Sequence, residues 1–335
     1  MSSDNTLLEP PSKKRKNNSS PIYQQTIFYK DVLINILSFS KFKFILQSAM
    51  LVSKEWKEAS ANVRLSLDLP GCECIIAEEE DKDEDEDEEE DTETYNLKIV
   101  CQCPNIANTT CLNMENCEMD ESSTKWLAKS KYLYNLEELY LNHCTIGSEG
   151  IANMVSDGSC LKKLKTLALE YSDIGETGVK MLANSPIMSN LTFLDLYNNA
   201  IGNTGLEHIA KSKYLKQLTH LDLENNEIDE EGIALIGSSE NFRELKFLSV
   251  AYNSFGENGL ELLKNSPLPK LETLRLHSCG LTFEECQTII DWPLLSQLKK
   301  LFISNNDVNE KQEQELKSLL SKKYPKLALS DSYSD

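Results

Sequence analysis

Four histidines, His143, His208, His220 and His277, are the side chains of this 335-residue chain best suited to proton transfer near neutral pH. None of them lies in an HExxH segment or beside a nucleophile and an acid at a matching spacing. The glycine-rich patterns GxxxxGK[ST] and GxGxxG, which bind phosphate groups, do not occur either. The sequence therefore favours a binding protein over an enzyme and indicates no cofactor.

Cysteine is the other residue type that could do chemistry. Two pairs are spaced by one residue, Cys72 with Cys74 and Cys101 with Cys103. Thiolates can ligate zinc, but zinc sites more often space their ligands by two to four residues, and the observed spacing also places both thiols on one face of a strand. We find no secretory signal and no apolar run of membrane length. The ten cysteines therefore indicate reduced thiols in the nucleus or cytoplasm. From the cysteine spacing we expect no metal site, and from the lack of a long apolar run we expect no membrane partner.

Acidic side chains concentrate in one segment. Residues 78–91 hold thirteen acidic residues and Lys82, and so carry −12 of the formal net charge of −20. Neighbouring charges lie about 3.5 Å apart in an extended chain, within the screening length of about 8 Å, so we expect a disordered acidic insertion at 77–94. It is either a plain surface loop or a docking segment for a basic partner. The overall charge argues against nucleic acid as a partner.

A compact basic cluster lies near the start of the sequence, in a stretch rich in serine, asparagine and proline. Its members are Lys13, Lys14, Arg15 and Lys16. The cluster resembles a monopartite nuclear localisation signal, which implies import into the nucleus. The alternative is a solvated tail with no targeting role.

A repeated apolar pattern extends from residue 105 to residue 328. One copy reads Leu136-x-x-Leu139-x-Leu141-x-x-Cys144-x-Ile146. Including a degenerate first copy, the starting positions lie 26 to 28 residues apart, at Thr109, Leu136, Leu164, Leu191, Leu218, Leu245, Leu271 and Leu298. Alternating leucines predict a short strand in each copy, and the glycine and helical apolar spacing that follow predict a turn and a helix.

The pattern LxxLxLxx(N/C)xL resembles the leucine-rich repeat, and the unit length resembles its ribonuclease-inhibitor-like class. The resemblance implies an α/β solenoid, a horseshoe with a parallel sheet on the concave side and helices on the convex side. It also implies that one inward polar residue per unit bonds the backbone of adjacent coils. These residues are Cys144, Asn199, Asn226, Asn253 and Cys279.

Side chains between the strand leucines should point out of the concave face, because alternate residues of a strand face opposite sides. The middle of this face is acidic and aromatic, which suits a basic protein partner. The alternative is a solvated strand face, where strand propensity favours the same aromatic residues. The residues expected to bind a partner are Tyr140, Glu170, Tyr171, Phe193, Asp195, Tyr197, His220, Asp222, Glu224, Phe247, Tyr252 and Arg275.

Residues 27–59 predict two amphipathic helices. They resemble the F-box, a helical motif that docks on the Skp-type adaptor of a cullin ubiquitin ligase. The resemblance assigns adaptor binding to Val32, Leu33, Ile36, Leu37, Phe39, Leu51, Val52 and Trp56. The segment departs from the family pattern at Ile27-Phe28, where the family has Leu-Pro, and at Ser40, where it has Leu. The alternative is a helical cap on the first repeat.

The order of these parts resembles that of F-box/leucine-rich-repeat proteins. The resemblance implies a substrate receptor of an SCF ligase, whose repeats hold the substrate while the F-box brings adaptor and cullin. Two alternatives stay open: a GTPase-activating protein of the Ran type, in which the acidic stretch follows the repeats instead of preceding them, and a scaffold or inhibitor without a ligase.

The predicted organisation has five parts. Residues 1–21 form a disordered basic tail and residues 22–62 the F-box-like helices. Residues 63–104 form cap strands, at 63–69 and 95–100, around the acidic insertion. Residues 105–328 form about eight repeats and end in an amphipathic cap built on Leu316, Leu319 and Leu320; residues 329–335 form a tail.

Overall fold

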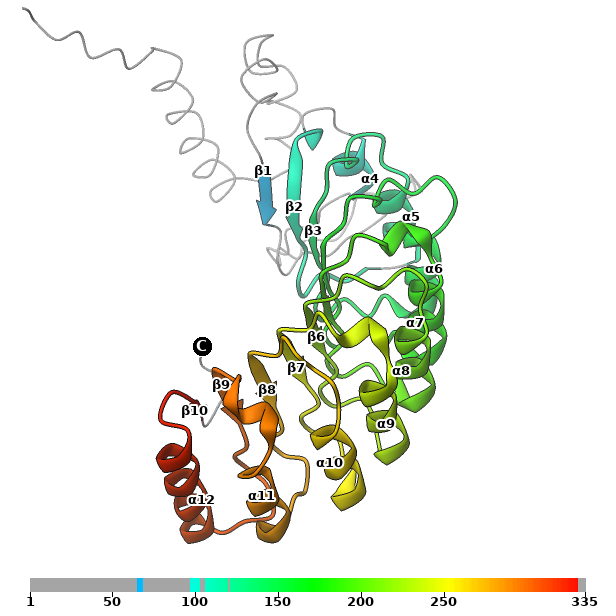
Figure 1. Ribbon diagram of the computed structural model, residues 1–335. Helices are drawn as coiled ribbons and strands as arrows, with labels where there is room; N and C mark the ends of the chain where they lie inside the picture. The colour runs from blue at the N-terminus through cyan, green and yellow to red at the C-terminus, as the bar shows by residue number, and fades with distance from the viewer. Residues whose placement is uncertain (1–64, 69–96, 103–105, 120, 331–335) are drawn as a thin grey trace, which may run out of the picture.

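The structure is a computed structural model that describes residues 65–68, 97–102, 106–119 and 121–330. These residues form a curved solenoid with a sheet along its inner side and helices along its outer side (Figure 1). The basic cluster, the F-box-like segment with its eight adaptor-binding residues, and the acidic insertion lie outside the described residues.

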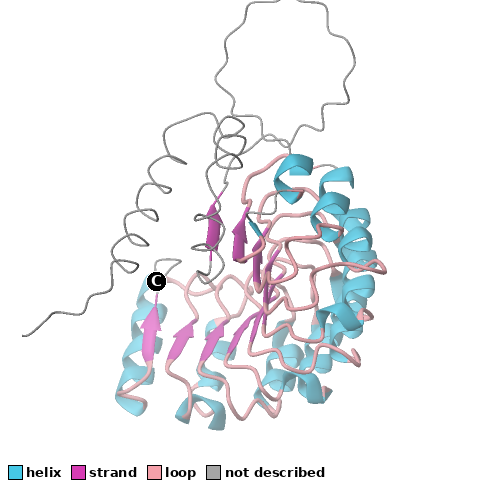
Figure 2. Ribbon diagram, turned by 90° about the horizontal axis from the view of Figure 1, so that it is seen from above, coloured by secondary structure: helices cyan, strands magenta, loops and turns pink. Residues whose placement is uncertain are grey.

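Ten strands of the described residues form one parallel sheet in sequence order. Figure 2 shows them side by side along the inner curve, with the helices outside. The strands are β1 (Leu65–Asp68), β2 (Thr109–Asn113), β3 (Glu138–Tyr140), β4 (Thr166–Ala168), β5 (Phe193–Asp195), β6 (His220–Asp222), β7 (Phe247–Ser249), β8 (Thr273–Arg275), β9 (Lys300–Phe302) and β10 (Ala328–Ser330).

Each connection between strands carries a helix on the convex side, as parallel strands require. The α-helices are α4 (Leu97–Cys101), α5 (Glu121–Ala128), α6 (Gly147–Met154), α7 (Gly175–Ala183), α8 (Gly202–Ala210), α9 (Glu230–Ser238), α10 (Gly256–Lys264), α11 (Phe283–Ile289) and α12 (Glu310–Lys323). Short 3₁₀ helices lead back to three strands: η2 (Pro186–Met188), η3 (Glu240–Phe242) and η4 (Pro293–Ser296).

The core lies between the sheet and the helices, and the repeat leucines fill it. The central leucine of each strand pairs with its counterpart in the next, for example Leu194 with Leu221, and both are fully buried. This register aligns equivalent residues of successive repeats on each face of the sheet. The α/β leucine-rich-repeat solenoid expected from the sequence is therefore confirmed.

Buried asparagines bond one coil to the next. The side-chain oxygen of Asn226 accepts hydrogen bonds from the backbone N–H groups of Asn199, at 3.0 Å, and Ile201, at 3.4 Å. Its amide nitrogen donates to the carbonyl oxygens of Leu196, at 2.7 Å, and Glu224, at 3.0 Å. The predicted role of the inward polar residue is thus confirmed, and the thiol of Cys144 also donates to the carbonyl oxygen of Met114 at 3.0 Å.

Three details of the predicted organisation are wrong. The segment at 95–100 was expected as a strand, but helix α4 begins at Leu97, because Leu97, Val100 and Cys101 follow the helical spacing and are buried together. The sheet does not stop at residue 328, since β10 pairs with β9 through Ser330. In the C-terminal cap, Leu316 and Leu320 are fully buried in the core. Leu319, which was expected to join them, is 38% exposed.

None of the helices among the described residues has the length and apolar character to cross a membrane.

Candidate functional site

The predicted binding residues lie on or beside strands β3 to β8, in the order of the repeats. The strands supply Tyr140 (β3), Phe193 and Asp195 (β5), His220 and Asp222 (β6), Phe247 (β7) and Arg275 (β8). The turns that follow β4, β5, β6 and β7 supply Glu170, Tyr171, Tyr197, Glu224 and Tyr252. The structure brings most of them together because the register aligns equivalent positions of neighbouring repeats.

Three rings form a stack across β5, β6 and β7. The ring centroids of Phe193 and His220 are 3.9 Å apart, and those of His220 and Phe247 are 3.8 Å apart. The planes are nearly parallel, at 17° and 4°. We call Phe193, His220 and Phe247 the ring row. Burial, followed by the positive charge of Arg275, lowers the pKa of His220 to about 4, so its ring is neutral at physiological pH.

Two aspartates lie two residues further along β5 and β6, on the same face as the ring row. Asp195 and Asp222 are paired across these strands. Each carboxylate accepts a backbone N–H from two residues ahead, Asp195 from Tyr197 at 3.0 Å and Asp222 from Glu224 at 2.9 Å. Burial is the main cause that raises the pKa of Asp195 to about 6 and the pKa of Asp222 well above its usual value.

Arg275 is the cationic side chain closest to these carboxylates. Its Nη1 lies 3.9 Å from Oδ2 of Asp222, longer than a hydrogen bond. The guanidinium carbon lies 5.1 Å from the ring centroid of Phe247 and 5.0 Å from that of Phe302, within the range of cation–π contacts. Among the described residues, no acceptor bonds its buried Nε. Arg275 therefore packs between two rings and offsets part of the charge of Asp222.

Glu224 is a buried member of this face. Its Oε2 accepts a hydrogen bond from the hydroxyl of Ser249 at 3.2 Å, and its Oε1 lies 3.5 Å from Nε2 of His277. Glu224 is only 1% exposed and Asp222 only 6% exposed. The expectation that both project freely from the concave face is therefore wrong for Glu224 and overstated for Asp222. The reason is lateral packing, because His277 and Ser249 approach Glu224 from neighbouring repeats.

Tyrosines flank the carboxylates toward the N-terminal repeats. Tyr171 stacks on His143 with centroids 4.8 Å apart, and its hydroxyl donates to that of Tyr197 at 3.0 Å. Glu170 lies beneath this cluster, 3.9 Å from Nε2 of His143, and burial raises its pKa. Tyr171 and, at the other end, Tyr252 are 37% and 43% exposed, so both offer ring surface to a partner.

Tyr140 lies one strand beyond this cluster. Its hydroxyl bonds a carboxylate oxygen of Glu138 at 3.2 Å. Burial, with the neighbouring charge of Glu138, raises the pKa of Tyr140 to about 12, so the hydroxyl stays protonated. Because β4 separates β3 from β5, Tyr140 lies apart from the ring row.

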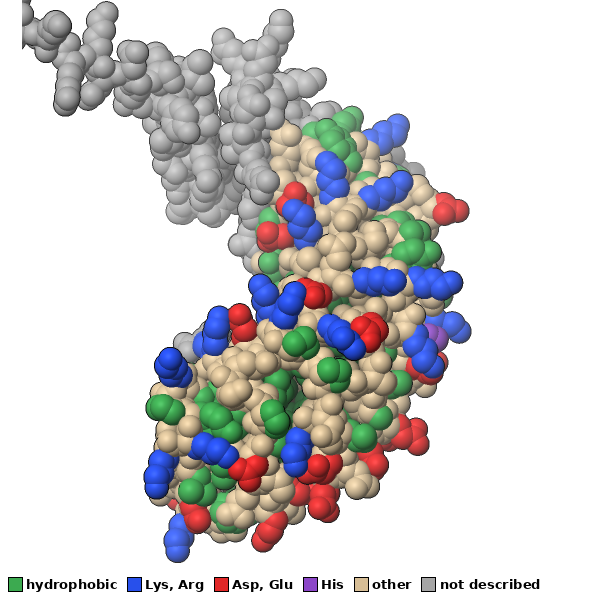
Figure 3. Space-filling model, in the orientation of Figure 1, with side chains coloured by type: hydrophobic (Ala, Val, Ile, Leu, Met, Phe, Trp, Pro, Cys, Tyr) green, Lys and Arg blue, Asp and Glu red, His purple; other side chains and the backbone are tan. Residues whose placement is uncertain are grey.

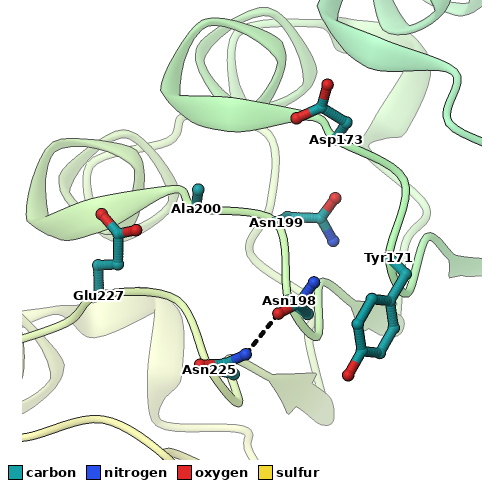
Figure 4. Close-up of a pocket in the computed structure, with 7 residues that line it drawn as sticks. All are labelled: Tyr171, Asp173, Asn198, Asn199, Ala200, Asn225 and Glu227. Atoms are coloured by element: carbon teal, nitrogen blue, oxygen red, sulfur yellow. Dashed lines mark hydrogen bonds between the residues drawn. The ribbon is translucent and has the colours of Figure 1, made fainter.

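A pocket of about 270 Å³ lies beside Tyr171, where the chain leaves β4, β5 and β6 for the helices (Figure 4). Its lining is polar, and the side-chain amide of Asn225 donates to that of Asn198 across one wall. The residues that line it are Tyr171, Asp173, Asn198, Asn199, Ala200, Asn225 and Glu227. All except Asn199 have a positive φ, which turns the backbone sharply at this edge.

Several contributors to this region were not predicted from the sequence, among them His143, which stacks on Tyr171. Phe302 occupies the repeat position of Arg275 one strand later, so the alternation of β9 could have identified it. Asn198 and Asn225 occupy the repeat position of Tyr171, after their strands, and their asparagine side chains suit the positive φ found there.

On the face seen in Figure 3, Lys and Arg side chains are scattered over the described part of the molecule. Acidic side chains lie between them and also gather along the lower right edge. The described residues contain no group of three or more His, Cys, Asp or Glu side chains arranged to hold a metal ion. The site consists of ring surface, carboxylates and one guanidinium, which are groups that can bind another molecule.

Comparisons with known proteins agree with this architecture. The family model described as Leucine Rich repeat matches residues 134–155, 160–183, 188–210 and 215–237. Each match contains one strand and the helix that follows it, from β3 with α6 to β6 with α9. A search of curated proteins found no similar sequence. Leucine-rich repeats of this kind imply a role in binding proteins.

Proposed function

We propose that this leucine-rich-repeat solenoid is the substrate receptor of a cullin-type ubiquitin ligase. Its concave face would hold a protein substrate, and residues 27–59 would dock on the Skp-type adaptor. The observation that carries the substrate-binding part is the concentration of ring surface and carboxylates on the concave face between β4 and β8. The adaptor-binding part is supported by the F-box-like pattern of residues 27–59.

The proposed function needs no catalytic residue in this chain. A receptor accelerates ubiquitin transfer by tethering, because holding substrate and ligase in one complex raises their effective concentration to about the millimolar range. The concave face supplies what tethering requires, a rigid surface whose shape is fixed by the core beneath it.

The adaptor-binding part is tested with the purified full chain and a purified Skp-type adaptor. We expect the two to co-elute in size-exclusion chromatography at micromolar concentration. A combined variant, Ile36→Ala, Leu37→Ala and Trp56→Ala, should lose the complex, whereas the concave-face variant Asp195→Lys should keep it. Circular dichroism of each variant checks that the solenoid is still folded.

Absence of any adaptor complex with the unaltered chain would remove the ligase role. Stimulated GTP hydrolysis by the small GTPase Ran in the presence of this chain would then favour the GTPase-activating alternative. A chain that does neither and still binds a protein through its concave face would be a scaffold or inhibitor.

The basic cluster at residues 13–16 supports a nuclear site of action. We expect a fluorescent fusion of the full chain to accumulate in the nucleus and to spread into the cytoplasm when Lys14 and Arg15 are replaced by alanine. Equal distribution of both fusions would argue for a solvated tail.

A further inference from the structure

We propose that the concave face at β5 and β6 binds one lysine or arginine side chain of the partner protein, with its charged head at Asp195 and Asp222 and its aliphatic stem along the ring row. The inference rests on the proposed use of the concave face for substrate capture. It does not depend on the adaptor or on the ligase.

The first argument is the balance of charge on this face. Glu170, Asp195, Asp222 and Glu224 come from three neighbouring repeats and interact electrostatically. Arg275 is the one arginine or lysine that lies among them in the described residues. Like charges on neighbouring strands are unfavourable, so a bound cation would relieve repulsion that is otherwise relieved only by Arg275 and by protonation of the carboxylates.

The second argument rests on ring contacts, because the protein already holds one guanidinium against two rings beside a carboxylate of this face. Arg275 lies between the rings of Phe247 and Phe302 and near the carboxylate of Asp222. Between β6 and β9, two rings, a carboxylate and a cation therefore already lie together on this face.

The same combination is incomplete one strand earlier. Asp195 has the ring of Phe193 two residues away on β5. Within the described part of the chain no lysine or arginine forms an ion pair with Asp195, and Arg275 acts on it only through its charge. Its carboxylate bonds the backbone N–H of Tyr197 and has acceptor capacity left for another donor. A side chain of the partner would supply the missing cation.

The ring row suits the stem of such a side chain. Phe193, His220 and Phe247 are each partly exposed, so their surfaces can contact methylene groups. His220 is neutral at physiological pH and therefore does not repel an incoming cation. The exposed ring of Tyr171 limits the site on the side of the N-terminal repeats.

Protonation opposes this binding. The charged groups that act on Asp195 are Glu170, Asp222, Glu224 and Arg275. Since burial raises the pKa of Asp195 to about 6, its carboxylate gains charge as the pH rises from 5 to 7.5. Affinity for a cation should increase over the same range.

The probe for the test is a fluorescent peptide of glycine and serine with a central Lys-Arg pair, and fluorescence anisotropy with the full chain reports binding. A matched peptide carries norleucine and citrulline, which keep the shapes and remove the charges. At about 0.15 M salt we expect the basic peptide to bind at least about tenfold more tightly than the neutral one. Asp195→Asn should weaken the basic peptide by about tenfold.

Two control variants separate this site from general attraction to an acidic protein. Glu257→Gln removes one exposed charge from α10 and should leave the affinity unchanged within about twofold. A variant with the acidic residues of 78–91 replaced by serine should still bind more tightly than the same variant carrying Asp195→Asn.

Equal effects of Asp195→Asn and Glu257→Gln would overturn the proposal, as would equal binding of the basic and neutral peptides. Binding that survives Asp195→Asn and disappears with the acidic insertion would assign the attraction to that insertion instead. Adaptor binding is measured separately, so the outcome does not bear on the ligase role.

Discussion

At the scale of single residues, the buried asparagines Asn199, Asn226 and Asn253 stabilise the fold by bonding one coil to the next. We call these three residues the asparagine ladder. The side-chain amides of Asn199, Asn226 and Asn253 each satisfy backbone groups of the preceding coil and of their own coil, and each residue is at most 2% exposed. Buried backbone groups left without partners cost about 1–3 kcal/mol each, so one amide secures several such groups at once. The resemblance to the leucine-rich repeat predicted this role, because the polar residue recurs at the point where the backbone turns in each repeat.

Replacing Asn226 by alanine should lower the free energy of unfolding by at least about 3 kcal/mol, because two N–H groups and two carbonyls of the core lose their partner. Urea unfolding followed by circular dichroism measures the loss. The matched control is Asn225→Gly in the preceding position, where glycine readily adopts the φ of 52° and we expect a loss below about 1 kcal/mol. Equal losses for the two variants would contradict the assigned role of Asn226.

Asp195 supports a prediction about pH. Its pKa is about 6 in the folded chain and near its ordinary value of 3.8 when unfolded, so the folded state holds the proton more tightly. The stability that this proton contributes is fully present below about pH 4 and is lost as the pH rises through 6. The amide introduced by Asp195→Asn is neutral throughout, and its oxygen can still accept the N–H of Tyr197.

We therefore expect Asp195→Asn to be more stable than the unaltered chain by about 3 kcal/mol at pH 8. The difference should shrink as the pH falls through 6 and disappear near pH 4. Urea titrations at four pH values between 5 and 8 follow most of this change. A variant that is less stable at pH 8, or a difference independent of pH, would show that burial does not raise this pKa.

The concave side chains show where prediction from the sequence stops. Strand alternation identified Phe193, Asp195 and Arg275 correctly as residues of one face. It could not show that Glu224 is buried, because that depends on which side chains of the next repeats lie against it. Small residues such as Ser249 let their neighbours approach closely, and this depends on lateral register between coils rather than on spacing along the chain.

At the scale of elements, the glycines of the helices have two distinct roles. Gly175 begins α7 with a φ of +63°, and no atom lies within 4 Å of the position its Cβ would occupy. Three residues later, the Cβ of an alanine at Gly178 would lie 2.5 Å from Cγ2 of Ile174 and 3.3 Å from Cα of Ser148 in α6. The first glycine serves the turn, and the second allows α7 to pack closely on α6.

Gly178→Ala should therefore destabilise the solenoid even though alanine favours helices by about 1 kcal/mol. Ile174 is buried and its branched side chain is stiff, so relief of the overlap must shift one helix against the other. We expect a net loss of about 1–2 kcal/mol in urea unfolding. Gly175→Asn is the control, because asparagine tolerates positive φ and has room; a larger loss there than at Gly178 would refute this account.

The two ends of the solenoid were less predictable than its middle. Each central repeat has its neighbours' pattern to confirm its own, whereas α4 stands before the first regular copy. There, a short apolar run fits a strand and a helix equally well, and packing decides for the helix. At the other end, Leu319 follows the apolar spacing of α12 but is 38% exposed, whereas Leu316 and Leu320 are fully buried.

At the scale of the whole molecule, every coil contacts mainly the coils beside it. Within the described residues, strands β2 to β9 pair on both edges, whereas β10 pairs with β9 alone. The stability of such a chain is close to a sum of units and their interfaces, and the ends open more easily than the centre. The sequence predicted this architecture because the same signal recurs in each unit.

Amide hydrogen exchange should reveal this gradient. We expect the amides of β5 and β6 to be the most protected and those of β10 to exchange at least about tenfold faster, because opening the last coil breaks one interface instead of two. Mass spectrometry of peptic fragments gives the rates without further variants. Uniform protection from β5 to β10 would instead indicate a single cooperative unit.

The ladder of buried amides also has a consequence for the reach of the molecule. Each amide bonds only its own coil and the adjacent ones, so no bond in the ladder depends on the total number of coils. Duplicating residues 191–217, which contain one strand and one helix, would therefore insert one complete coil and lengthen the inner arc by about 4.8 Å. The length of the concave face can therefore be changed in steps of one repeat, without altering the bonds within the other repeats.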